Sequence, residues 1–244
     1  MSLGTRLAEL QVAIMLLTRL PAGKINGAVP DLAAARWAFP IVGGLIGFLT
    51  WLAYAGALAI GAPPAIAAVL AVAALTLLTG ALHFDGLADY ADGIGGGRDK
   101  AHALEIMRDS RVGSYGMLAM IIVVGLWTVS VKTADPGSLA FVGAAMLSRA
   151  GMVVVQEILP PARPDGMAQL ASGQSRAARV VLAAVAVGAL LFWTVPLGVC
   201  IAAVTVVAWQ ARRKIGGQTG DVLGAVQLLS ETAIWVALAC MAGS

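Results

Sequence analysis

The stretch AFPIVGGLIGFLTWLAYAGALAI, residues 38–60, contains no charged residue. About 20 apolar residues in a helix span the roughly 30 Å hydrocarbon core of a bilayer, so this stretch predicts a membrane-spanning helix. Similar stretches recur, and the chain is 59% hydrophobic and only 12% charged. An ordinary soluble domain carries about 25% charged residues. We therefore predict an all-α, polytopic membrane protein, a bundle of about seven transmembrane helices with short interfacial helices.

The seven predicted spans share length and apolar composition; they are Ala38–Ile60, Pro64–Leu82, Gly116–Val131, Ser138–Leu159, Val180–Trp193, Pro196–Trp209 and Val222–Met241. As one helix, the apolar run 180–209 would measure about 45 Å, too long for a bilayer without strong tilt. Two short helices that turn near Pro196 are therefore favoured. No internal repeat or Gly/Ser-rich linker divides the chain, so residues 1–244 are expected to form one membrane-embedded catalytic domain.

The N-terminal apolar run Leu10–Leu17 follows Glu9 and ends before Pro21. It is too short to span a bilayer, and no small-residue cleavage site follows it. We expect a retained interfacial or re-entrant helix rather than a signal peptide.

Positive charge is distributed unevenly about these spans. With seven crossings, 14 of the 16 Lys and Arg residues fall with the N-terminus and with loops 83–115, 160–179 and 210–221. Only Lys132 lies opposite, and Arg149 lies inside a span. The positive-inside rule then predicts a multi-pass protein of a bacterial cytoplasmic (inner) membrane, with its charged loops in the cytoplasm. The net charge of +3 is too dispersed for nucleic-acid binding, so the lipid bilayer is the expected macroscopic partner.

The densest polar motif is HFDGLADYADG, residues 83–93. Its carboxylates, Asp85, Asp89 and Asp92, share one face of a helix at relative positions 0, 4 and 7. Three carboxylates this close repel one another, and Mg²⁺ commonly bridges carboxylates to substrate phosphates. The motif predicts a Mg²⁺ site for phosphoryl or diphosphate chemistry; a solvated acidic helix face is the alternative. His83 is a further catalytic candidate, or a residue that only hydrogen-bonds at the interface.

A second motif, IMRDSRVGSYG, spans residues 106–116. Arginine side chains and hydroxyl groups bind phosphate oxygens, so Arg108, Ser110 and Arg111 are expected to bind substrate. Asp109 could complete the metal site as a fourth carboxylate.

A third motif, GGQTGDVLGA, spans residues 216–225 and precedes the last predicted span. Backbone N–H groups at glycines and at a helix N-terminus bind anions, which makes Gly217, Thr219 and Asp221 candidate substrate-binding residues. In the alternative interpretation the stretch only starts a helix, with Asp221 as its N-cap.

Arg149 lies about 10 residues, roughly 15 Å, from the cytoplasmic end of its span. A charge at that depth costs at least about 2.5 kcal/mol and needs a partner. Glu231 has nearly the same depth in the last span, so we predict an Arg149–Glu231 ion pair. As the alternative, Arg149 extends to the interface and binds substrate phosphate.

In order along the chain, the motifs LTRLP (residues 17–21), HFDGLADYADG, IMRDSRVGSYG and GGQTGDVLGA resemble those of the cobalamin-5′-phosphate synthases, also called adenosylcobinamide-GDP ribazoletransferases. The resemblance covers essentially the whole chain. It implies a Mg²⁺-dependent transfer that joins adenosylcobinamide-GDP to α-ribazole or its 5′-phosphate and releases GMP. On this resemblance Asp85, Asp89 and Asp92 are metal ligands, with small-molecule corrinoid-GDP and a ribazole nucleoside or nucleotide as the bound partners.

Two other functions fit parts of the pattern. CDP-alcohol phosphotransferases also place Asp clusters on a membrane helix, but this chain lacks their Ala-Arg pair after the first Asp-Gly. A small transporter would use intramembrane charge, but its site would lie near the midplane, whereas these acids collect in loops.

Overall fold

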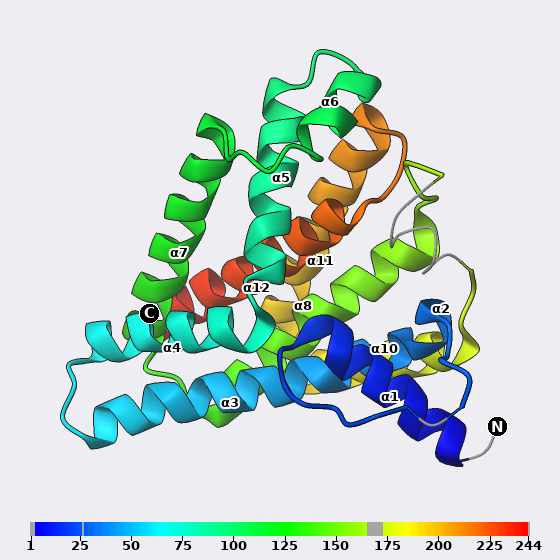
Figure 1. The fold of residues 1–244 in the computed structure, drawn as a ribbon. Coiled ribbons are helices and arrows are strands. Elements are labelled where there is room, and N and C mark those ends of the chain that lie inside the picture. Colours follow the sequence, from blue (N-terminus) through cyan, green and yellow to red (C-terminus); the bar gives the residue numbers. More distant parts are fainter. Residues whose placement is uncertain (1–2, 26, 165–172, 244) are drawn as a thin grey trace.

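The computed structural model describes residues 3–25, 27–164 and 173–243, and its regular elements are helices (Figure 1). In chain order they are α1 Leu3–Leu17, α2 Leu32–Ala35, η1 Arg36–Ala38, α3 Phe39–Ala59, α4 Pro64–Thr79, α5 Leu82–Gly96, α6 Lys100–Ile106, α7 Ser114–Ala134, α8 Ser138–Ile158, α10 Arg176–Phe192, α11 Thr194–Lys214 and α12 Gly220–Ala242. Within the described residues, β pairing is limited to one isolated bridge between Pro161 and Gln218. The predicted all-α membrane fold is confirmed.

Five helical segments in the described part of the chain are long and apolar enough to cross a membrane; they are Leu32–Ala59, Ser114–Ala134, Ser138–Ile158, Thr194–Lys214 and Gly220–Ala242. The number rises to six if α4 and α5, which meet at 92°, form one broken span. The sequence predicted about seven. The difference arises because α4 has 16 residues and α10 has 17, which is short for the full hydrocarbon thickness.

The helix boundaries agree closely with the predicted segments. The apolar run 180–209 divides into two helices, as predicted, with the break at Trp193 and Pro196 in the first turn of α11. At the N-terminus, α1 has 15 residues and is too short to span, as expected.

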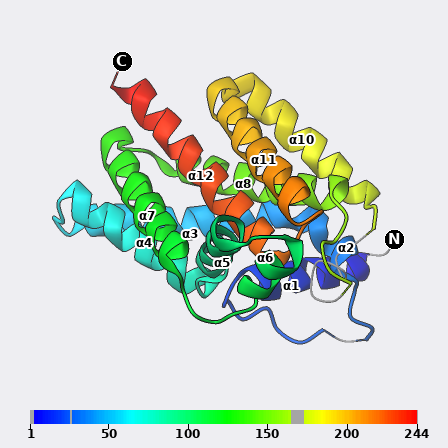
Figure 2. The ribbon, with the colours of Figure 1, turned by 90° about the horizontal axis from the view of Figure 1, so that it is seen from above.

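Helix α12 lies at the centre of the bundle, where α5, α7, α8 and α11 all contact it (Figure 2). Helix α3 packs along α8 on the far side. Three rings from different helices, Trp127, Phe141 and Trp235, pack with centroids 4.8–6.0 Å apart and fill the space between α7, α8 and α12. The N-terminal half of α12 is buried nearly all round, so its first residues have fixed neighbours.

A sharp corner between α4 and α5 sets the direction of the acidic helix. Gly80 and Ala81 both have φ of 60°, a left-handed conformation that ends α4. The LTRLP motif closes this corner, since the Arg19 backbone N–H donates to the Leu78 carbonyl at 2.7 Å. A side chain at Gly80 would collide with the Arg19 side chain. Helix α5 therefore leaves α4 at 92° and runs toward α6 (Figure 1).

Candidate active site

Two helices supply the carboxylates of the site. Gly86 on α5 faces Gly224 on α12, and a Cβ atom added at Gly86 would lie 3.2 Å from the Cα atoms of Gly224 and Asp221. The two backbones can approach this closely only because both positions are glycine. The contact brings Asp221, at the start of α12, beside Asp85 and Asp89 on α5.

The charges of these residues act on one another. Asp89 is repelled by Asp85 and Asp221 and attracted by Arg163. The Arg163 Nη2 atom lies 3.1 Å from Asp221 Oδ2, in a partly buried ion pair. Asp85 is exposed and Asp89 partly exposed, so their oxygens are accessible to a ligand. The site therefore holds several carboxylates, and Arg163 offsets part of their charge.

Asp92, the third member of the predicted triad, has a structural role that its spacing did not predict. Its Oδ2 accepts a hydrogen bond from the Gly113 backbone N–H at 2.7 Å, and its Oδ1 accepts one from Gly116 at 2.9 Å. These donors belong to the N-terminus of α7, where a carboxylate is favoured. Asp92 is 7% exposed. It therefore fixes α7 against α5, and its metal-ligand role stays a prediction.

The second motif divides into two parts. Asp109 and Arg111 form an exposed ion pair, with Arg111 Nη2 2.6 Å from Asp109 Oδ2. The Arg111 guanidinium holds the pKa of the Asp109 carboxyl at about 2, below its usual value. Ser110, between them, is exposed. Asp109 is thus engaged by Arg111, and Arg111 is expected to reach a phosphate only after leaving this carboxylate.

Arg108 lies apart from that pair. It lines a pocket of about 460 Å³ between α6 and the segment 162–164, and Arg163 lines the same pocket. Of the predicted phosphate-binding residues, Arg108 is therefore the one that the structure places beside the acidic site.

A second pocket, of about 170 Å³, is lined by two of the carboxylates. Its polar lining comes from His83, Asp85, Gln156 and Asp221, and Leu17 of the LTRLP motif contributes to its apolar wall. His83 is 3% exposed, and among the described residues its Nε2 has no hydrogen-bond partner. The structure thus brings His83 and two of the candidate carboxylates to one cavity.

The third motif is held by a neighbouring loop. Gln218 N–H donates to the Pro160 carbonyl, and Ala162 N–H donates to the Gln218 carbonyl, each at 2.8 Å. A side chain at Gly217 would collide with Pro160, so this glycine permits the pairing of the two loops. The paired loops place the next residue, Arg163, beside Asp221.

The cap of α12 differs from the alternative considered for this motif. Thr219 is the N-cap, since its hydroxyl oxygen accepts from the Val222 N–H at 3.2 Å. The Thr219 hydroxyl also contacts Asp221 Oδ2 at 3.1 Å. Because Thr219 caps the helix, the Asp221 carboxylate is directed to Arg163 and the acidic site instead.

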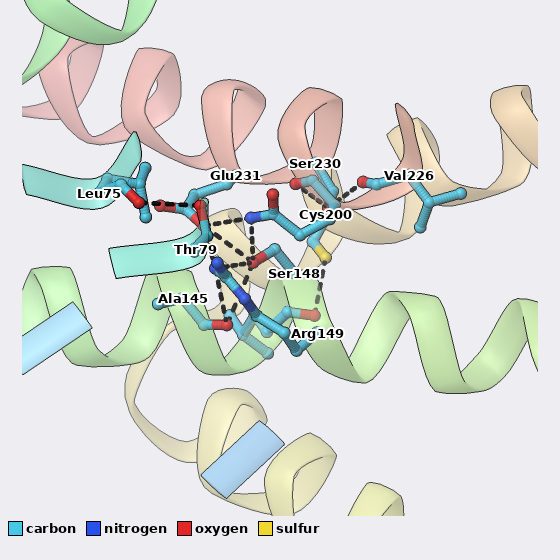
Figure 3. Close-up of polar contacts among 11 residues, drawn as sticks. Leu75, Thr79, Ala145, Ser148, Arg149, Cys200, Val226, Ser230 and Glu231 are labelled. Atoms are coloured by element: carbon cyan, nitrogen blue, oxygen red, sulfur yellow. Dashed lines mark hydrogen bonds and ion pairs between the residues drawn. The ribbon is translucent and has the colours of Figure 1, made fainter. Parts of the chain in front are cut away.

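The predicted pair of Arg149 and Glu231 is confirmed (Figure 3). Arg149 Nη1 lies 2.5 Å from Glu231 Oε2, and the Arg149 side chain is fully buried. The same Oε2 accepts from Ser148 Oγ at 3.0 Å and from Gln227 Nε2 at 2.5 Å. The role of Arg149 in binding substrate phosphate stays a prediction, and its burial between α8 and α12 does not favour it.

The sequence analysis did not identify Arg163 as a site residue. It counted Arg163 only among the positive charges of loop 160–179, which indicate membrane topology. Residues 165–172 of that loop lie outside the described residues. No residue pattern near Arg163 indicates its partner, because the contact with Asp221 depends on the pairing of Pro160 with Gln218.

Among the described residues, no three His, Cys, Asp or Glu side chains are already arranged to hold a metal ion. The donors present nevertheless suit Mg²⁺, which binds protein through one or two carboxylates and takes its other ligands from water and substrate phosphates. Asp85, Asp89 and Asp221 are such donors, and their mutual repulsion favours a cation between them.

Comparison with known proteins agrees with the motifs. The family model for cobalamin-5-phosphate synthase matches residues 9–239. Proteins named adenosylcobinamide-GDP ribazoletransferase are 43% identical in Bradyrhizobium diazoefficiens, over 93% of this chain and 92% of the relative, and 43% identical in Azorhizobium caulinodans, over 93% of each chain. A relative of the same name in Mesorhizobium japonicum is 37% identical over 93% of this chain and 91% of its own length. No solved structure matches the chain significantly. With a family model that covers nearly the whole sequence, the chain belongs to the cobalamin-5-phosphate synthase family.

Proposed function

We propose that this protein joins adenosylcobinamide-GDP to α-ribazole or its 5′-phosphate, with release of GMP and with Mg²⁺ as cofactor, at the cytoplasmic face of a bacterial inner membrane. Its family makes it a transferase of cobalamin synthesis. The names of the relatives include the donor and the ribazole group, which supports these two substrates. The polar site described above contains the side chains that such a transfer requires.

The observation that carries the proposal is the contact between Gly86 and Gly224, which assembles Asp85, Asp89 and Asp221 from two helices. Attack of a hydroxyl on a diphosphate places additional negative charge on the transferred group and on the leaving nucleotide. Bound Mg²⁺ would neutralise part of that charge, and Asp85, Asp89 and Asp221 are the residues to hold it.

The protein's own side chains supply the remaining functions. Arg163 and Arg108 line one pocket next to the carboxylates, where guanidinium groups orient phosphate oxygens and stabilise the leaving group. His83 lines the smaller cavity with Asp85, in a position to accept the proton of an acceptor hydroxyl. Donor and acceptor would then reach the carboxylates from two different pockets.

Release of GMP from adenosylcobinamide-GDP tests this function directly. Purified full-length protein in lipid nanodiscs is incubated with both substrates, with and without Mg²⁺. We expect GMP only when both substrates and the metal are present, and no GMP from Asp85→Asn. Asp31→Asn, an exposed carboxylate near η1, serves as the matched control and should retain activity. GMP release from adenosylcobinamide-GDP without the ribazole substrate would contradict the proposal. Full activity after chelation of Mg²⁺ would also contradict it.

The family match does not support the two other functions that the sequence left open. Asp221 also lies in the first turn of α12, next to the loop that joins α11 to α12, which suits catalysis at the membrane surface better than transport through the bilayer.

A further inference from the structure

The ion pair between Arg163 and Asp221 lies where two pockets of different character meet. Arg163 lines the pocket of about 460 Å³ that it shares with Arg108. Asp221 lines the pocket of about 170 Å³ that contains Asp85 and His83. The 3.1 Å contact between Arg163 Nη2 and Asp221 Oδ2 therefore joins a pocket lined by two guanidinium groups and one carboxylate, Glu105, to a pocket lined by two carboxylates.

Arg163 is not saturated by this contact. Its Nε is buried and, among the described residues, has no hydrogen-bond partner. Its side chain is 16% exposed and lines the pocket of about 460 Å³. A guanidinium has five N–H donors in a planar fork, and a buried donor without an acceptor is costly. A ligand with several closely spaced anionic oxygens would satisfy these donors.

The acidic site alone would repel such a ligand. Asp89 already experiences repulsion from Asp85 and Asp221, and Arg163 is the cation that offsets it. Arg108 and Arg163 outnumber Glu105 in their pocket, so a phosphate group is attracted there more strongly than in the pocket of His83 and Asp85. The pocket of about 460 Å³ lies in the size range of small-molecule sites.

We propose that Arg163 is a substrate-binding residue that exchanges partners, from Asp221 in the free protein to the diphosphate of the nucleotide donor in the complex. The nucleoside 5′-diphosphate part of the donor occupies the pocket shared with Arg108, and its diphosphate extends past Arg163 toward the carboxylates. This inference rests on the proposed function, since it places the donor of that reaction. It adds a residue that the motifs did not include and assigns the direction from which the donor enters.

Binding of GDP to the protein in nanodiscs, measured by calorimetry with Mg²⁺ present, tests the exchange. Arg163→Gln removes the fork, and we expect GDP to bind roughly 10- to 100-fold more weakly, as for a lost hydrogen bond to a charged group. Arg163→Lys retains the charge without the fork and should fall between. Arg212→Gln makes the same change on the exposed end of α11, outside this pocket, and should bind GDP like the wild type.

Kinetics and stability separate substrate binding from a structural role. For Arg163→Gln we expect a raised KM for adenosylcobinamide-GDP, an unchanged KM for the ribazole substrate, and a Tm close to that of Arg212→Gln. GDP affinity equal to that of Arg212→Gln would overturn the inference. So would matching losses of Tm in Arg163→Gln and Asp221→Asn with GDP affinity intact, because the ion pair would then be purely structural.

If Arg163→Gln does not fold, Arg163→Lys decides the question, and wild-type GDP affinity in that variant overturns the inference. Failure of the proposed function would look different, since the wild-type protein itself would then release no GMP from adenosylcobinamide-GDP. An active wild type with an unaffected Arg163 variant rejects only the partner exchange.

Discussion

Removal of one partner of the Arg149–Glu231 pair should destabilise the protein strongly. Arg149→Met leaves the Glu231 carboxylate in the bundle interior without its countercharge, and loss of one member of a buried ion pair costs about 3–5 kcal/mol. Ser148 and Gln227 still donate to Glu231 Oε2, at 3.0 and 2.5 Å, so we expect the low end of that range, about 3 kcal/mol. For a chain of this size the loss corresponds to a fall in Tm of roughly 6–12 °C.

A double-mutant cycle in detergent, followed by tryptophan fluorescence, measures the coupling. Glu231→Gln added to Arg149→Met removes the stranded charge and should recover part of the loss, with a coupling energy of about 1–3 kcal/mol. Arg212→Met, on an exposed surface, is the control and should change stability by less than about 0.5 kcal/mol. Strictly additive losses would refute the pair as a stabilising contact. Weakened substrate binding at unchanged stability would instead support the alternative role of Arg149 at substrate phosphate.

Three further results are expected. Gly86→Ala should separate α5 from α12 and reduce turnover at least ten-fold. Gly125→Ala, where an added Cβ meets nothing within 4 Å, is the control and should remain active. Equal activities of the two variants would argue against the helix contact as the basis of the site. Asp92→Asn should lower the free energy of unfolding by about 1–3 kcal/mol, because an amide has a single acceptor oxygen for the two backbone N–H groups at the start of α7; wild-type thermal stability would contradict this role. In intact cells a cysteine introduced at Ser110 should resist an impermeant thiol reagent. The exposed Cys240, near the C-terminal end of α12, should react with it. Labelling of position 110 from outside would contradict the predicted topology.

The local features of the fold were predictable from residue order because they depend on short-range chemistry. The acidic motif forms a helix, as its spacing predicted, since it lies within α5. The apolar run 180–209 divides because a single helix would be too long for the bilayer. Even the Arg149–Glu231 contact could be predicted, since the two residues have equal depth in their spans and a charge at that depth requires a partner.

The candidate site was predictable only in part. Asp85 and Asp89 were identified by their spacing on one helix face, and Asp221 by its glycine-rich surroundings. Their assembly was not, because spacing along α5 cannot show which face of α12 it meets. The same limit explains Asp92, which shares the predicted face of α5 but accepts hydrogen bonds from two backbone N–H groups at the start of α7.

By itself, the sequence determined that this is a helical membrane protein, the approximate extent of its long apolar helices, and which of its loops carry charge, since these follow from hydropathy, helix geometry and the cost of charge in lipid. The tertiary structure decided which charges meet. The left-handed corner at Gly80 and Ala81 turns α5 toward α12, Gly86 and Gly224 let the two backbones touch, and the pairing of Pro160 with Gln218 brings Arg163 to Asp221. The contacts of Gly86 with Gly224 and of Pro160 with Gln218 join residues far apart in the chain. The energy of such a contact depends on the spatial approach of both partners, which no local pattern along one helix specifies.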